Sequence, residues 1–80
     1  MIQADLENIM SIAAINARNQ FRGRVIDIVT GPVVSEVVVG TPFGAVTSVI
    51  TTRSIKELNL EIGSDVLALV KSTEVAIAKL

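Results

Sequence analysis

The sequence predicts an all-β domain with five short strands and one short helix between the third and the fourth strand. Three observations support this fold class. Valine and isoleucine, which favour extended backbone, fill most of the chain after its polar segment around residue 20. Glycine and proline separate these runs at turn positions, and a helical period occurs only once between them. A length of 80 residues fits one such domain.

The N-terminal segment has a different pattern. Residues 2–14 carry apolar side chains at helical spacing, namely Ile2, Leu6, Ile9, Met10 and Ala13. This predicts an N-terminal arm or short helix over residues 1–14, ahead of a main domain of residues 15–80. A packing arm without function is as good an interpretation as any functional one. Met10 could also be the natural start, in which case residues 1–9 are an extension.

The first strand is predicted over residues 20–29, QFRGRVIDIV, and ends at a Thr-Gly-Pro turn signal. Its apolar alternation changes phase: Phe21 and Val25 share one face, whereas Ile26 and Ile28 continue on the other. A phase change next to a glycine is typical of a β-bulge. We therefore expect a bulged, coiled strand.

The second and third strands are predicted over residues 33–40 and 45–52. The tight connection between them, residues 41–44, contains Pro42 at a position that β-turns favour. These strands form a hairpin in this interpretation.

The helix is predicted over residues 53–60, where Ser54 and Glu57 have the spacing of a capping box. Two further strands follow, over residues 66–72 and 73–80, and a Ser-Thr corner separates them. Three strands, a short helix and two strands are the element order of a small Greek-key barrel of the oligonucleotide/oligosaccharide-binding type.

Self-association is expected for two reasons. The apolar runs Val37–Val39 and Val66–Val70 do not alternate, so both faces of these strands must be covered. A domain this small usually needs a disulfide, a metal or a partner, and the chain has no Cys and no His. The sequence therefore predicts a homo-oligomer, at least a dimer.

Composition excludes several function classes. No apolar run approaches the roughly 18 residues of a membrane span, and the acidic Asp5 and Glu7 do not fit a secretory signal, so we expect a cytoplasmic protein. A net charge of −1 and only Phe21 and Phe43 as aromatic residues argue against nucleic acid. Without His or Cys, and with scattered carboxylates, we expect neither an enzyme nor a metal site.

Hydrogen-bond donors remain as candidate functional groups. They lie at strand ends and corners and combine two cations with amides and hydroxyls: Arg18, Lys71, Asn16, Asn19, Thr51, Ser54, Ser72 and Thr73. Such a set suits a small tetrahedral oxyanion better than a cation. Structural alternatives stay open, because Arg18 could form a surface ion pair, Ser54 could cap the helix and Lys71 could protect an exposed edge.

Three stretches resemble the molbindins, the small molybdate-binding (Mop) proteins. NARNQFRGRV, residues 16–25, resembles the family's S-A-R-N-Q-L-K-G-K-V opening. ITTRSIKELNLEIGSDVLALVKSTEV, residues 50–75, is similar to its I-T-x-x-S-V-x-E-L-G-L-x-x-G and A-x-x-K-[SA]-[ST]-x-V segments. The match covers about residues 16–78, with the motifs in the family order.

The resemblance implies a barrel that pairs with a second copy and assembles further, as a hexamer of three dimers. It also implies molybdate or tungstate held between subunits by hydrogen bonds, with no covalent cofactor and no metal coordination. The residues that match the family's binding motifs are Ala17, Arg18, Asn19, Thr51, Ser54, Lys71 and Ser72. Asn16 occupies the position of the motif's serine, so an amide replaces one hydroxyl ligand.

The function expected from this resemblance is intracellular storage or homeostasis of molybdate or tungstate. One alternative is an oxyanion-sensing module of a larger regulator or transporter system. The other is a structural or nucleic-acid-binding barrel, which the composition disfavours.

Overall fold

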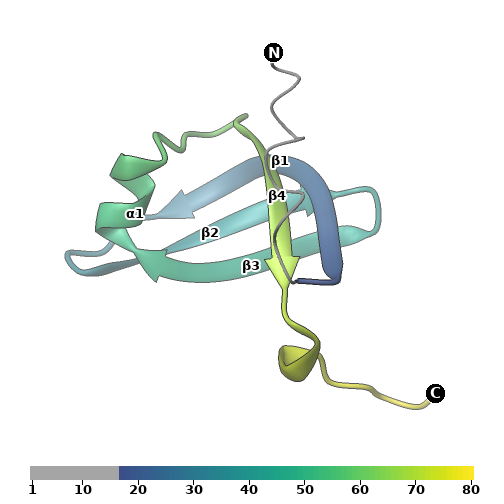
Figure 1. Cartoon of the computed structure of the whole chain (residues 1–80). Coiled ribbons are helices and arrows are strands. Elements are labelled where there is room, and N and C mark those ends of the chain that lie inside the picture. The colour runs from purple at the N-terminus through teal and green to yellow at the C-terminus, as the bar shows by residue number, and fades with distance from the viewer. Residues whose placement is uncertain (1–16) are drawn as a thin grey trace. The chain divides into compact units, whose positions relative to one another are not determined.

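The computed structural model describes residues 17–80 (Figure 1). The predicted arm or helix over residues 1–14, the possible start at Met10 and the candidate ligand Asn16 lie outside the described residues. Two compact units are present. One comprises Gln20–Leu69, and the other joins residues 17–19 with residues 70–80.

A single antiparallel sheet dominates the fold. Its strands are β1 (Asn19–Val29), β2 (Val34–Thr41), β3 (Gly44–Thr51) and β4 (Asp65–Val70), and its one α-helix among the described residues is α1 (Thr52–Glu57). The spatial order β3-β2-β1-β4 places the fourth strand beside the first, which is Greek-key order. Figure 1 shows the curl of this sheet and the helix between β3 and β4, which confirms the predicted all-β class.

The predicted bulge in β1 is confirmed. Val25 pairs with Val39 and Asp27 with Val38, so Ile26 is the extra residue. The bulge restores Ile28 to the inner face that Val25 also occupies. Ile26 itself does not continue the apolar face, since it is 55% exposed.

Close approach of β1 and β2 explains one of the glycines in β1. A Cβ atom on Gly23 would meet the carbonyl oxygen of Gly40 and would lie 2.9 Å from Cγ1 of Val39. Only glycine allows the two strands to come this near, because both contacts are shorter than side-chain carbons tolerate.

The hydrophobic core lies on the inner face of the sheet. Val25, Val37 and Val39 are buried at its centre, and partly buried side chains surround them: Ile28, Val46, Ile50, Ile55, Leu60 and Val66. The alternating residue Val38 is half-buried on the other face. Val37 and Val39 thus pack in the core of this chain. That a second subunit covers the opposite face of the strand stays a prediction.

The helix differs from its prediction at both ends. It begins at Thr52, with Thr51 as N-cap accepting a hydrogen bond from Ser54 N, so the prediction of Ser54 as N-cap is wrong. Thr51 has the extended backbone that a cap requires because it ends β3 directly. After the helix, Asn59 has φ 54°, the left-handed conformation often filled by glycine beyond a helix.

The fifth strand predicted over residues 73–80 is not formed. Ser72–Glu74 form a 3₁₀ turn, η2, and residues 75–80 have no regular secondary structure. The side chains of Val75 and Ile77 are 46% and 89% exposed. Alternating apolar residues supply strand propensity, but a strand also needs a neighbour for its backbone hydrogen bonds.

Candidate oxyanion site

The Arg18–Asn19 and Lys71–Ser72 motifs lie in one compact unit, where β1 begins and β4 ends. Asn19 Nδ2 donates a hydrogen bond to the carbonyl oxygen of Val70 at 3.1 Å, across 51 positions of sequence. Arg18 precedes this asparagine, and Lys71 follows Val70. The bond lies within one compact unit and brings the Arg-Asn and Lys-Ser segments together.

The side chains around this bond have distinct environments. Ala17 is buried, which explains why the motif needs a small residue there. Arg18, Lys71 and Ser72 are exposed, so in the single chain their charges and hydroxyl are available to a ligand. Asn19 is half-buried and uses one amide hydrogen in its bond to Val70. It therefore holds the two segments together, and its second amide hydrogen is a candidate donor to a ligand.

Backbone donors accompany Lys71. It is the N-cap of η2, whose Glu74 N–H donates to the Lys71 carbonyl at 2.9 Å. The N–H groups of Ser72 and Thr73 open this turn, where the turn itself offers them no acceptor. An ammonium, a hydroxyl and backbone N–H groups thus lie within three consecutive residues, which is a donor set suited to an oxyanion.

A second cluster forms where β3 passes into α1. Thr51 Oγ1 accepts the Ser54 N–H at 3.1 Å, and the two hydroxyl oxygens lie 2.8 Å apart. One hydroxyl proton is used in the bond between them, and one remains. The pair can therefore give a single hydroxyl donor to a ligand while the helix cap stays intact.

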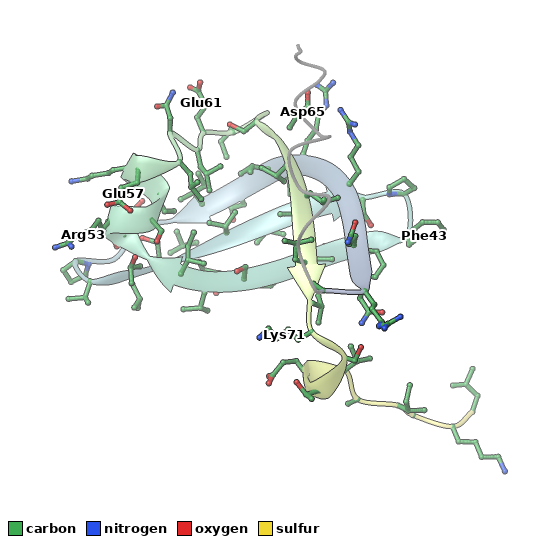
Figure 2. All side chains as sticks on the ribbon, viewed as in Figure 1. Phe43, Arg53, Glu57, Glu61, Asp65 and Lys71 are labelled. Carbon is green, nitrogen blue, oxygen red and sulfur yellow. The ribbon has the colours of Figure 1, made fainter. Side chains whose placement is uncertain are left out.

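Arg53 stands beside this pair and was missed by sequence reasoning. Together with Pro32, Val33 and Thr51 it lines an open hollow of about 400 Å³. Figure 2 shows Arg53 and Glu57 projecting from α1, and both side chains are exposed. The only sequence signal was a cation inside the Thr-x-x-Ser segment, at a position that the motif leaves variable.

The candidate residues therefore form two clusters. Arg18, Asn19, Lys71 and Ser72 belong to one compact unit, whereas Thr51 and Ser54 belong to the other. In the first cluster the bond from Asn19 to the Val70 carbonyl links the two segments, and in the second Thr51 and Ser54 are bonded to each other.

Other charged groups do not extend these clusters into a metal site. Residues 17–80 contain no group of three carboxylate, His or Cys side chains that could hold a metal ion. Arg24 lies 3.4 Å from Asp65 in an exposed ion pair, so it has a partner of its own. In the same part of the chain, no helix is long and apolar enough to cross a membrane.

The TOBE domain model matches residues 15–77. Molybdenum-pterin-binding protein 2 from Clostridium pasteurianum is 42% identical over 65 residues, covering 80% of this chain and 96% of the relative. The molybdenum transport protein ModE from Azotobacter vinelandii is 46% identical over 65 residues, which are 80% of this chain but 24% of ModE.

A solved structure agrees with these matches. The molybdate-binding protein from Sporomusa ovata superposes with a TM-score of 0.77 at 35% identity, covering 81% of this chain and 97% of that one. The family model, the curated relatives and the solved structure thus agree, and the chain belongs to the TOBE domain family, as a relative of the Mop proteins.

Proposed function

We propose that this protein binds molybdate or tungstate and stores or buffers it in the cytoplasm. The bond from Asn19 to the Val70 carbonyl carries the proposal, because it joins the Arg18–Asn19 and Lys71–Ser72 segments in one unit. The relatives support the choice of ligand, since one is named for molybdenum-pterin binding and another for molybdate binding.

The chemistry of a dianion explains this donor set. Removing water from a doubly charged oxyanion is costly, so the site must replace that water with cations and several fixed hydrogen-bond donors. Arg18 and Lys71 supply the charge in this proposal. Neutral donors come from Asn16, Asn19, Thr51, Ser54 and Ser72, with Ala17 leaving room for the ligand.

A second copy of the chain completes the site in this proposal. Arg18, Lys71 and Ser72 are exposed in the single chain, and in this proposal another subunit provides the desolvated walls that strengthen their bonds. The exposed apolar side chains of Val75, Ile77 and Leu80 also favour burial against a partner. We propose a homo-oligomer, at least a dimer and in full a hexamer of three dimers.

The protein is a binding protein rather than an enzyme in this proposal, and it carries no covalent cofactor. The site offers donors that hold a ligand, and the relatives compared above are named for binding and transport. Nucleic acid and membranes are not its partners.

A sensing role is the second candidate. It is favoured by the match to ModE, of which this chain spans only 24%. In that case the same domain reports the oxyanion to a larger regulator or transporter system.

Calorimetric titration of the purified protein with molybdate, tungstate and sulfate, beside melting curves at rising anion concentration, tests the ligand. A ligand that binds only the folded protein raises the melting temperature with its concentration. We expect molybdate and tungstate to bind and to compete for the same sites. Absence of both heat and a melting shift with either anion would refute the proposal.

A further inference from the structure

A partly buried network of hydrogen bonds lies next to the Thr51–Ser54 pair, at the adjoining residue Thr52. Ser35 on β2 is 3% exposed and is the buried polar side chain among residues 17–80. Its hydroxyl oxygen lies 2.8 Å from Thr52 Oγ1 and accepts the Gly31 N–H at 3.3 Å. Thr52 Oγ1 in turn donates to the Gly31 carbonyl at 2.7 Å.

These contacts fix the direction of every bond. The Thr52 proton points to the Gly31 carbonyl, so Ser35 must donate to Thr52 Oγ1. The bonds then run in a closed cycle from Gly31 N–H through Ser35 and Thr52 back to the Gly31 carbonyl. Partly buried bonds in a closed cycle reinforce one another, and loss of one member leaves its neighbours without a protein partner.

The cycle joins three elements at the place where β3 becomes α1. Gly31 lies in the β1–β2 loop, Ser35 in β2, and Thr52 is the first residue of the helix. Thr52 N also donates to the Val33 carbonyl at 2.8 Å, and its neighbour Thr51 pairs with Val34. The peptide that links Thr51 to Thr52 is therefore held from both sides.

We propose that Thr52 and Ser35 are positioning residues for the oxyanion: through Gly31 they set the backbone of Thr51, and with it the orientation of the Thr51–Ser54 hydroxyl pair. This inference rests on the proposed function. Neither side chain touches the ligand. Their hydroxyls fix the start of the helix and the β1–β2 loop, and with them the positions of the Thr51 and Ser54 hydroxyl oxygens.

The cycle also limits the size of anion that the pair accepts. A donor on a held backbone contacts an oxygen at one position only, and an anion of different size leaves the bond long or bent. Loss of one hydrogen bond of the cycle would let the Thr51 and Ser54 hydroxyls move toward a smaller anion. Discrimination between molybdate and sulfate should fall along with affinity for molybdate.

The test compares isosteric variants of the full-length protein. Thr52→Val removes the hydroxyl and keeps the side-chain shape, Thr52→Ser keeps the hydroxyl, and Ser35→Ala opens the cycle at another member. Thr41→Val is the matched control, because Thr41 Oγ1 also donates to a carbonyl, that of Gly44, at 2.7 Å and accepts the Phe43 N–H at 3.1 Å. That network lies at the opposite end of the β2–β3 hairpin.

Molybdate and sulfate affinities are measured by calorimetry at a temperature where every variant is folded. We expect Thr52→Val and Ser35→Ala to weaken molybdate binding by about 10-fold, the size usual for residues that orient a ligand-binding group. Both variants should also lower the ratio of molybdate to sulfate affinity. Thr52→Ser should restore both values, and Thr41→Val should lower the melting temperature without changing either.

Wild-type affinity and selectivity in both Thr52→Val and Ser35→Ala would overturn the inference, even if the variants melt earlier. Ser54→Ala separates this failure from that of the function. If Ser54→Ala weakens molybdate binding while the cycle variants do not, only the positioning role is lost. If the wild-type protein does not bind molybdate at all, the function and the inference fall together.

Discussion

Thr51 Oγ1 accepts the Ser54 N–H at 3.1 Å and lies 2.8 Å from Ser54 Oγ, so the helix cap and a candidate ligand donor share the same hydroxyl pair. The capping bond needs Thr51 as acceptor and the Ser54 backbone as donor. It does not use the Ser54 hydroxyl. Stability and anion binding can therefore be separated by substitution.

Ser54→Ala is expected to weaken molybdate binding, because the Thr51 hydroxyl that remains loses the bond that orients it. The melting temperature should stay nearly unchanged, because the backbone N–H at position 54 still donates to Thr51. Thr51→Val removes the cap and should lower the free energy of unfolding by about 1 kcal/mol in addition to weakening binding. Melting curves of the ligand-free variants and calorimetric titrations distinguish the two effects. Equal loss of stability in both variants would contradict the division of roles.

Arg18→Gln and Lys71→Gln should each weaken molybdate binding by about 2 kcal/mol, since each removes a charge-assisted bond at a desolvated site. The ligand-free protein should keep its stability or gain slightly, because two neighbouring cations repel without an anion. Arg24→Gln is the control: Arg24 is paired with Asp65, so its loss should change affinity only through a weak, salt-screened effect. Unchanged titrations for both Arg18→Gln and Lys71→Gln would remove these residues from the site.

Anion size should matter more than anion charge. Molybdate and tungstate are expected to compete with each other, whereas the smaller sulfate leaves some buried donors without an acceptor, at about 1–3 kcal/mol each. Phosphate, partly protonated at neutral pH, must find an acceptor for its O–H among donors and should bind poorly. Competition titrations measure all four anions, and equal affinity for sulfate and molybdate would show a loose site.

Light scattering at micromolar concentration is expected to give the mass of a hexamer. Ile77→Glu should reduce that mass, because a carboxylate replaces an apolar side chain that is 89% exposed in the single chain and that we place against a second copy. Phe43→Ser, at the β2–β3 turn, is the control for loss of an exposed apolar group. A wild-type protein that is folded but monomeric would contradict both the predicted assembly and the proposed site between subunits.

Gly23→Ala should lower the free energy of unfolding by about 1–3 kcal/mol, the usual cost of forcing atoms into a packed region. The added Cβ meets the backbone carbonyl of Gly40, which cannot move without opening the β1–β2 pairing. Gly40→Ala should cost less, because its nearest contact is the Ile26 side chain at 3.1 Å and that side chain can turn away. Chemical denaturation of the two variants measures the difference.

The sequence alone was sufficient for the elements whose signal is local. Runs rich in valine and isoleucine, separated by glycine and proline turns, predicted β1 to β3, and the phase change around Val25 and Ile26 predicted the bulge found there. The motifs also selected the residues that the Asn19–Val70 bond brings together. Such patterns are readable because side-chain period and turn chemistry are properties of a few neighbouring residues.

Tertiary structure determined the features that depend on distant partners. Thr51 and Ser54 both suit a helix cap, and the end of β3 selected Thr51. Residues 73–80 have strand propensity, yet no strand forms over them in the single chain, since a strand requires a neighbouring backbone. The cycle of Gly31, Ser35 and Thr52 left no sequence signal, because only the packed fold brings a loop, a strand and a helix start within hydrogen-bond distance.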